Sequence, residues 1–148
     1  KKYTLFFMVS YEKGQHAVKI EISKRGNGAK FEPKNFMGMT LLVMTKEDMV
    51  AGKMAALLER KQFAGRDAFD VCHFLKDGWE INVGLLEKTT GLTLSEIAKK
   101  SLEIVESKIT AELLHGLGEL IDSKQKAWVK EHLKEELGFW LRLKGKIE

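Results

Sequence analysis

The chain has 148 residues, of which 44% are hydrophobic and 31% are charged, a composition typical of a soluble globular protein that can bury one sizeable core. No apolar run is long enough to cross a bilayer, so we expect no membrane partner, and the single Cys72 has no partner for an intrachain disulfide, which favours a reducing, cytoplasmic setting. The net charge of +4 permits nucleic-acid binding without indicating it, because acidic residues accompany the basic ones along the chain.

The first predicted element is a β-hairpin. Residues 3–11 and 16–23 fit two strands, and the polar, glycine-containing EKGQ between them supplies a turn. Side chains alternate along a strand, so Ile20 and Ile22 share one face and Glu21 lies on the opposite, polar face. An exposed antiparallel face commonly carries Lys and Glu, and Glu21 by itself indicates no more than that.

The next residues predict a loop followed by another strand. Residues 25–36 contain glycines, an asparagine and the only proline of the chain, which are typical of a loop. MTLLVM, residues 39–44, then predicts a short, largely buried strand.

A helix is predicted from Thr45. TKED resembles a capping box, in which the Thr45 hydroxyl accepts from a free backbone N–H and Asp48 reaches back toward the helix start. Lys46, Lys53 and Arg60 are spaced seven apart and therefore line one edge of this helix, beside a buried stripe made by Val50, Met54, Leu57 and Leu58.

The second predicted helix, GRDAFDVCHFLKDG, begins at Gly65 and ends at Gly78, a residue type typical of a C-terminal cap. Its apolar stripe is formed by Ala68, Val71, Cys72 and Leu75. Asp67 and Asp70 are three apart, about 5–6 Å at Cβ, close enough to share a cation or a basic side chain. The plainer interpretation is that acids near a helix N-terminus gain about 0.3–1 kcal/mol each from the helix dipole, and that Arg66 pairs with either of them.

The rest of the chain predicts a helical scaffold. A helix starts at Thr93 with its own capping box to Glu96, and further helical patterns occupy residues 111–121 and 123–143. The three tryptophans and the phenylalanines lie in apolar patterns, so we expect core packing rather than base stacking. The sequence contains no phosphate-binding glycine motif, zinc motif or nucleophile elbow.

Two of these segments together resemble a known family. VKIEIS, residues 18–23, and VAGKMAALLERKQFAGRDAFDVCHFL, residues 50–75, resemble the AbiEii/AbiGii family of nucleotidyltransferase toxins, which belong to phage-defence (abortive infection) toxin–antitoxin systems. The resemblance implies an α+β fold: the distal part of a nucleotidyltransferase domain in residues 1–62, and a helical C-terminal region in residues 63–148. It also implies transfer of a nucleotide from a nucleoside triphosphate to an acceptor, in some members a tRNA end.

The resemblance assigns roles to six residues. Lys53, Arg60 and Arg66 would bind the nucleotide, since phosphoryl chemistry needs cations near the triphosphate. Glu21 matches the strand carboxylate of the family, which would hold Mg²⁺ or act as a base. The acids of the family's RDxxD motif match Asp67 and Asp70, which would serve catalysis or nucleotide positioning.

This chain also departs from the family pattern. Gly52 stands where a glutamate is common, and the Gly-Ser and Asp-x-Asp elements that bind metal in the family are absent from these residues and would lie before Lys1. Because one carboxylate holds Mg²⁺ poorly, we expect the chain alone to be catalytically silent. The alternatives are a non-catalytic module for a partner such as an antitoxin, and a basic RNA-binding module without chemistry.

Overall fold

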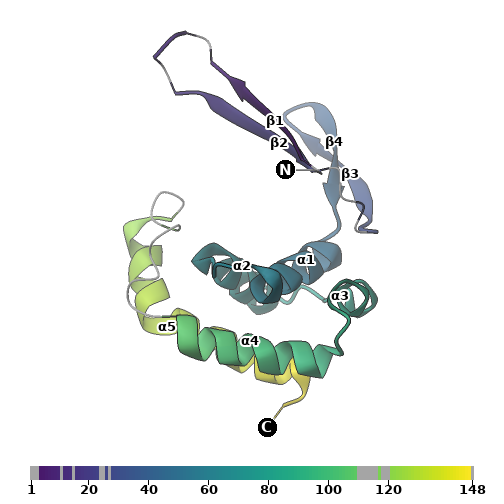
Figure 1. Cartoon of the computed structure of the whole chain (residues 1–148), viewed down its shortest axis with the longest axis vertical. Coiled ribbons are helices and arrows are strands. Elements are labelled where there is room, and N and C mark those ends of the chain that lie inside the picture. Colours follow the sequence, from purple (N-terminus) through teal and green to yellow (C-terminus); the bar gives the residue numbers. More distant parts are fainter. Residues whose placement is uncertain are drawn as a thin grey trace.

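The protein folds as two β-hairpins followed by helices, so the expected α+β class is confirmed (Figure 1). The computed structural model describes residues 4–147 except 11, 15, 24, 25, 27, 110–116 and 118–120. Within these residues the elements are β1 (Thr4–Val9), β2 (Val18–Ser23), β3 (Phe31–Phe36), β4 (Met39–Met44), α1 (Lys46–Glu59), α2 (Gly65–Lys76), α3 (Val83–Thr90), α4 (Leu94–Lys108) and α5 (Ser123–Gly145).

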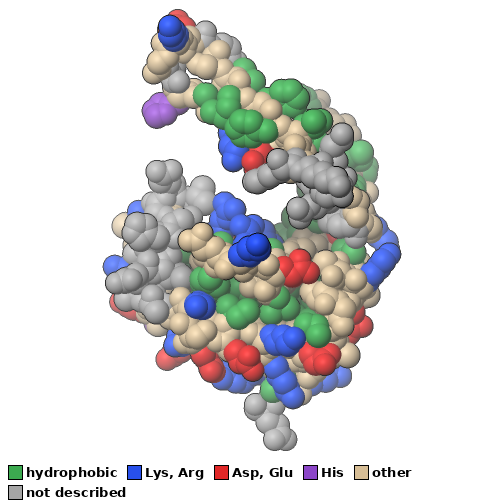
Figure 2. All heavy atoms as spheres, in the orientation of Figure 1, with side chains coloured by type: hydrophobic (Ala, Val, Ile, Leu, Met, Phe, Trp, Pro, Cys, Tyr) green, Lys and Arg blue, Asp and Glu red, His purple; other side chains and the backbone are tan. Residues whose placement is uncertain are grey.

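The first hairpin pairs β1 with β2 in antiparallel register, with Phe6 opposite Glu21 and Met8 opposite Lys19. This confirms the predicted hairpin and the placement of Glu21 on the more polar face. The other face is entirely apolar and is 42–58% exposed; it comprises Leu5, Phe7, Val9, Val18, Ile20 and Ile22. Figure 2 shows apolar side chains gathered along this hairpin, which projects away from the helices.

The second hairpin corrects the loop expected over residues 25–36. Phe31–Phe36 form strand β3, which pairs with β4 around a tight turn at Met37 and Gly38, both with positive φ. Pro33 is tolerated because β3 has no hydrogen-bonded neighbour on its other side among the described strands. The strand predicted at residues 39–44 is confirmed, but its expected burial is wrong: Leu42 is 75% exposed.

The junction between the hairpins and the helices depends on Asp48. Thr45 precedes α1 as predicted, but its side chain makes no cap hydrogen bond to a described residue, so the expected capping box is wrong. Asp48 is instead buried and accepts hydrogen bonds from the backbone N–H of Lys30 and from Asn82 Nδ2, both at 2.5 Å. Asn82 is the N-cap of α3, a helix that the sequence patterns did not predict. The buried carboxylate of Asp48 thus links α1 to the residue before β3 and to the N-cap of α3.

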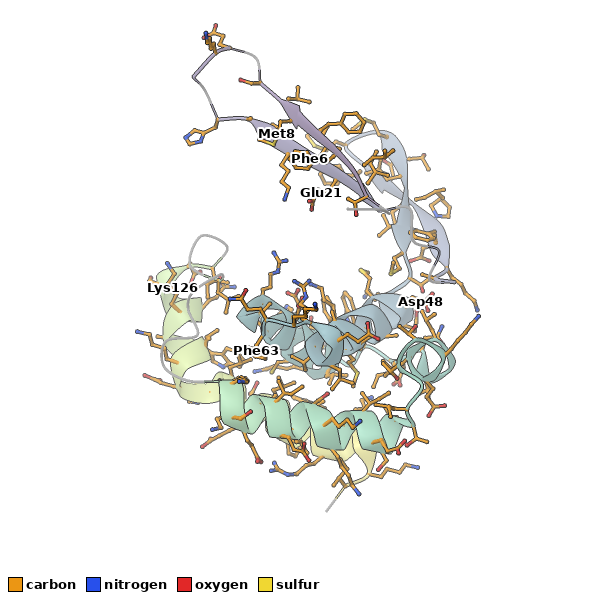
Figure 3. All side chains as sticks on the ribbon, in the orientation of Figure 1. Phe6, Met8, Glu21, Asp48, Phe63 and Lys126 are labelled. Atoms are coloured by element: carbon orange, nitrogen blue, oxygen red, sulfur yellow. The ribbon has the colours of Figure 1, made fainter. Side chains whose placement is uncertain are left out.

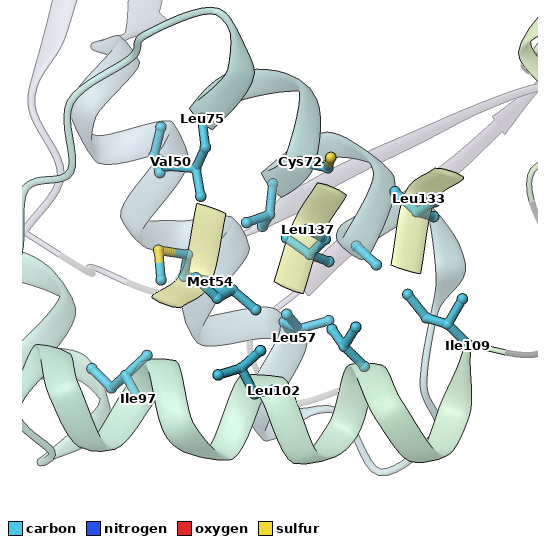
Figure 4. Close-up of a cluster of buried hydrophobic side chains, with 14 of the residues drawn as sticks. Val50, Met54, Leu57, Cys72, Leu75, Ile97, Leu102, Ile109, Leu133 and Leu137 are labelled. Atoms are coloured by element: carbon cyan, nitrogen blue, oxygen red, sulfur yellow. The ribbon is translucent and has the colours of Figure 1, made fainter. Parts of the chain in front are cut away.

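The hydrophobic core lies among the helices, with α5 packed along α4 and with α1 and α2 over them (Figure 4). The predicted apolar stripes of α1 and α2 are buried, except that Leu58 is half-buried. Both partners of the Thr93–Glu96 capping box make their bonds, and α5 has an equivalent box at Asp122. The helix predicted over residues 111–121 lies mostly outside the described residues. No helix in the described part of the chain is long and apolar enough to span a bilayer.

Candidate functional site

The basic edge of α1 and the acids of α2 meet in one cluster. Lys53 Nζ lies 2.6 Å from Asp70 Oδ2 and 3.1 Å from Asp67 Oδ1. The two aspartates therefore share one ammonium, as their spacing on the helix allows. Arg60, one residue past the end of α1, approaches the same Asp67 from the other side, with Nε 2.7 Å from Oδ2. This Lys53 cluster joins α1 to α2.

Asp67 is the most enclosed member of the cluster, with 1% of its side chain exposed. A carboxylate so deeply buried needs partners, because desolvation of an unpaired charge is costly. Lys53 supplies a hydrogen bond to Oδ1, whereas the Arg60 contact is not aligned as a hydrogen bond, so Oδ2 lacks a donor among the described residues. One oxygen of this buried acid therefore retains unused hydrogen-bonding capacity.

Lys53 is held firmly but remains accessible. Partial burial acts to lower the pKa of Lys53, but the hydrogen bonds and charges of Asp70 and Asp67 outweigh it, so this pKa is raised and the ammonium stays protonated near neutral pH. About a third of the side chain, 33%, is exposed. Two of its three N–H donors are taken up by the aspartates, which leaves one for a ligand.

A pocket of about 300 Å³ opens beside this ammonium. One part of its wall is charged, and the rest is apolar, a combination typical of small-molecule sites. It lies against α1, with one wall from α2 and one from the end of β4; its lining residues are Met44, Met49, Gly52, Lys53, Ala56, Arg60, Asp67 and Phe74.

The other two predicted site residues lie outside this cluster. Arg66 is exposed and makes no hydrogen bond or ion pair with a described residue, so the plain interpretation in which it pairs with Asp67 or Asp70 is wrong. Glu21 lies on the first hairpin, apart from α1 and α2 (Figure 3), where Lys19 Nζ contacts its carboxylate at 3.0 Å. The structure thus brings together four of the six predicted residues: Lys53, Arg60, Asp67 and Asp70.

The residues present do not fit a magnesium site. Mg²⁺ requires hard, free carboxylate oxygens, whereas Asp67 and Asp70 already hold a lysine ammonium between them. Within the described ranges no three His, Cys, Asp or Glu side chains are grouped closely enough to hold a metal ion.

Cys72, two residues after Asp70 on α2, is not a candidate nucleophile. Its thiol is buried, and burial together with the charge of Glu136 raises its pKa to about 12. Nucleophilic cysteines need the thiolate at neutral pH. The cysteine is part of the core.

Some residues that line the pocket were not predicted from the sequence as site residues. Phe74 lies seven residues after Asp67, two turns along α2, so it shares a face with that acid, and this spacing was an available signal. Its ring stacks on Trp79 with centroids 4.4 Å apart, and Lys46 Nζ lies 4.6 Å from the Trp79 ring. No local spacing indicated the contribution of Met44, which comes from β4.

A comparison with protein families identifies the family of the chain. The family model described as nucleotidyl transferase AbiEii toxin, type IV TA system, matches residues 1–135, beyond the segments that carried the resemblance in the sequence. No curated protein and no solved structure matches the chain. The match spans both hairpins and most of the helical body, and the chain therefore belongs to the AbiEii family of nucleotidyl transferase toxins of type IV toxin–antitoxin systems.

Proposed function

We propose that the protein transfers a nucleotide from a nucleoside triphosphate to an acceptor such as tRNA, and that the pocket beside Lys53 receives the nucleotide. The observation that carries this proposal is the Lys53 ammonium, held by two carboxylates at 2.6 and 3.1 Å on the wall of a pocket. A cation fixed in this way needs no reorganisation when a phosphate arrives, which is the main requirement of electrostatic stabilisation.

The charges of the site support an anionic ligand. The charges of Lys53 and Arg60 balance those of Asp67 and Asp70, and Arg66, which lies outside the cluster but next to Asp67 in the sequence, adds one formal positive charge before any ligand binds. In this scheme the two aspartates position Lys53 and do not touch the reacting atoms. Arg66, which has no partner among the described residues, is a free guanidinium for a phosphate.

The first experiment measures transfer of an α-labelled nucleotide to tRNA, with each of the four nucleoside triphosphates, by the protein as its source cell makes it. Arg66→Ala is the most informative variant because the side chain makes no described contact and its loss leaves folding intact. We expect nucleotide affinity and transfer to fall about 10- to 100-fold, the effect of one hydrogen bond to a charged group. Lys61→Ala, which removes another exposed cation without a described contact, is the matched control.

Lys53→Arg provides the second variant, because it keeps the charge but changes its shape and reach. We expect transfer to fall while the melting temperature moves little. If Arg66→Ala and Lys53→Arg both bind nucleotide and transfer it like the unaltered protein, the Lys53 cluster is a structural ion pair only and the proposal fails.

A second candidate function is a non-catalytic module that binds a partner protein such as a cognate antitoxin. Its support is the exposed apolar face of the first hairpin, since contiguous exposed apolar patches mark interaction sites. Ile20→Lys places a charge in the middle of that face. If this change abolishes binding of the antitoxin while Lys53→Arg leaves all measured activity unchanged, partner binding is the better description.

A further inference from the structure

A second cavity lies between α2 and α5. This cavity and the Lys53 cluster lie on opposite sides of the exposed surface of α2. It has a volume of about 240 Å³, and we call it the aromatic groove; its lining residues are Phe69, His73, Lys76, Asp77, Gln125 and Trp128. The Phe69 and His73 rings lie parallel within 5°, with centroids 6.1 Å apart, and Trp128 meets Phe69 edge-on at 6.3 Å. Aromatic faces from two helices thus surround one small space.

We propose that the aromatic groove binds an unpaired base of the RNA acceptor by stacking, an inference that rests on the proposed nucleotide transfer. Stacking on aromatic side chains is the common means by which proteins hold single-stranded RNA, because every base has a π-face. The proposal departs from the core-packing role that the apolar pattern around Trp128 predicts.

The burial of the rings supports a site rather than simple packing. Phe69 and Trp128 are half-buried against the helical core, and the His73 side chain is 60% exposed. These rings therefore keep surface that no described residue covers. The cavity is smaller than the roughly 300–1,000 Å³ of sites that enclose whole drug-sized ligands, so its size suits a single base better than a nucleoside triphosphate.

The polar groups of the groove suit a base and its backbone. Lys76 Nζ is held by both carboxylate oxygens of Glu136, at 3.0 and 3.1 Å, and lies 5.1 Å from the centre of the Trp128 ring. Gln125 and Asp77 line the same space and offer an amide and a carboxylate for hydrogen bonds to a base edge. His73 Nε2 lies 3.6 Å from Asp77 Oδ2, beyond hydrogen-bonding distance, so this contact does not occupy the imidazole.

The position of the groove relative to the Lys53 cluster favours the acceptor as the ligand. Phe69 and Asp70 are neighbours on α2, so one faces the groove and the other holds Lys53. Arg66 and His73 are seven residues apart, hence on the same side of the helix and about 10 Å apart along its axis. An RNA chain with one base stacked in the groove would place its following phosphates past Arg66 toward Lys53. Figure 2 shows Lys and Arg side chains on this upper surface of the helical body, over α1 and α2.

The test measures RNA affinity without any nucleotide, using fluorescence anisotropy and a short labelled single-stranded RNA. The first comparison uses the unaltered protein and needs no variant: the same RNA is prepared with abasic residues at its 3′ end. We expect the abasic RNA to bind about 5- to 100-fold more weakly, the effect of one or two lost stacking contacts. Equal affinity for the two RNAs overturns the proposal.

Variants then locate the contact. Phe69→Leu and His73→Ala are expected to weaken binding of the intact RNA several-fold while the affinity for nucleoside triphosphate, measured separately, stays unchanged. Phe139→Leu is the matched control, because Phe139 is an exposed aromatic residue on α5, the helix that carries Trp128, and it does not line the groove. Folded Phe69→Leu protein that binds RNA like the unaltered protein contradicts the proposal.

The two proposals fail in different ways. If the base-dependent RNA binding is found but no nucleotide is transferred, the aromatic groove stands and the proposed function falls. If nucleotide is transferred and abasic RNA binds as well as intact RNA, the proposed function stands and the groove has no role in holding the acceptor.

Discussion

The two hairpins and the helical body differ in how far they bury their apolar side chains. In the helical body, large side chains such as Leu75, Leu133 and Leu137 are completely enclosed. In the hairpins, comparable side chains stay about half exposed, and the strands are joined chiefly by their backbone ladders. A two-stranded hairpin alone is marginal in water, so the stability of the described chain comes from its helices. The Lys53 cluster belongs to this stable part, whereas Glu21 does not.

The largest expected effect tests this contrast with the same substitution in both regions. Leu137→Ala removes a fully buried side chain from α5 and should lower the free energy of unfolding by about 2–5 kcal/mol. Leu42→Ala removes a side chain that is 75% exposed on β4 and should change that free energy by no more than about 0.5 kcal/mol. Denaturant unfolding followed by circular dichroism measures both. A loss above about 2 kcal/mol for Leu42→Ala would show that the second hairpin packs against something in solution.

The next largest effect is expected at the junction between the hairpins and the helical body. Asp48→Ala leaves the Lys30 N–H and the Asn82 side chain without their acceptor, which should cost about 1–3 kcal/mol. The amide of Lys30 should also exchange with solvent faster, while amides in the middle of α5 change only with global stability. Hydrogen exchange resolves the two effects.

Glu47→Ala is the control for Asp48→Ala, since it removes the exposed carboxylate one residue earlier. It should leave both the stability and the exchange of Lys30 nearly unchanged. If Asp48→Ala behaves like this control, the buried carboxylate does not connect the hairpins to the helices.

Sequence patterns predicted the helical body better than the hairpins, for a physical reason. The stripes of α1 and α2 could be recognised because burial on one side of a helix imposes a 3.6-residue period. β3 was missed because its glycine-rich approach and Pro33 suggest a loop, and only its pairing with β4 makes it a strand. How far β4 is buried depends on what covers it, which its own residues do not encode.

The candidate site was partly predictable for a similar reason. The spacing of Asp67 and Asp70 indicated a shared cation, but spacing could not say which one, because Lys53 lies on another helix. Arg66, the neighbour in sequence, was the wrong partner. Asp48 shows the same limit, because local sequence suggested a helix cap while its actual partners lie 18 and 34 residues away.

A smaller effect is expected from a buried hydroxyl group without a hydrogen-bond partner within the helical body. The Ser101 hydroxyl is buried in α4 and has no hydrogen-bond partner among the described residues. Ser101→Ala removes this unsatisfied group and should stabilise the protein by up to about 1 kcal/mol. Ser107→Ala is the control: its hydroxyl is exposed and donates to the Glu103 carbonyl at 2.7 Å, so its loss should matter little. A melting temperature that falls with Ser101→Ala but not with Ser107→Ala would reveal a partner for the buried hydroxyl.

The smallest expected effect is the pH dependence of the α4 capping box. Hydrogen bonds from the Thr93 hydroxyl and backbone lower the pKa of Glu96 below its ordinary 4.5. A lowered folded-state pKa means that the unfolded chain binds the proton first on acidification. The contribution of Glu96 is therefore complete well above pH 4.5 and is lost as the pH falls through the folded-state value.

Glu96→Gln isolates that contribution, because the equivalent box of α5 already uses an amide: Gln125 accepts from the Asp122 N–H at 3.0 Å. The variant keeps the cap geometry and removes the ionisation. Its stability should match that of the unaltered protein most closely at acidic pH and fall slightly behind it near neutral pH, as thermal melts from pH 3 to 7 would record. Parallel curves across this range would mean that the Glu96 charge contributes nothing to folding and that the capping box acts through its geometry.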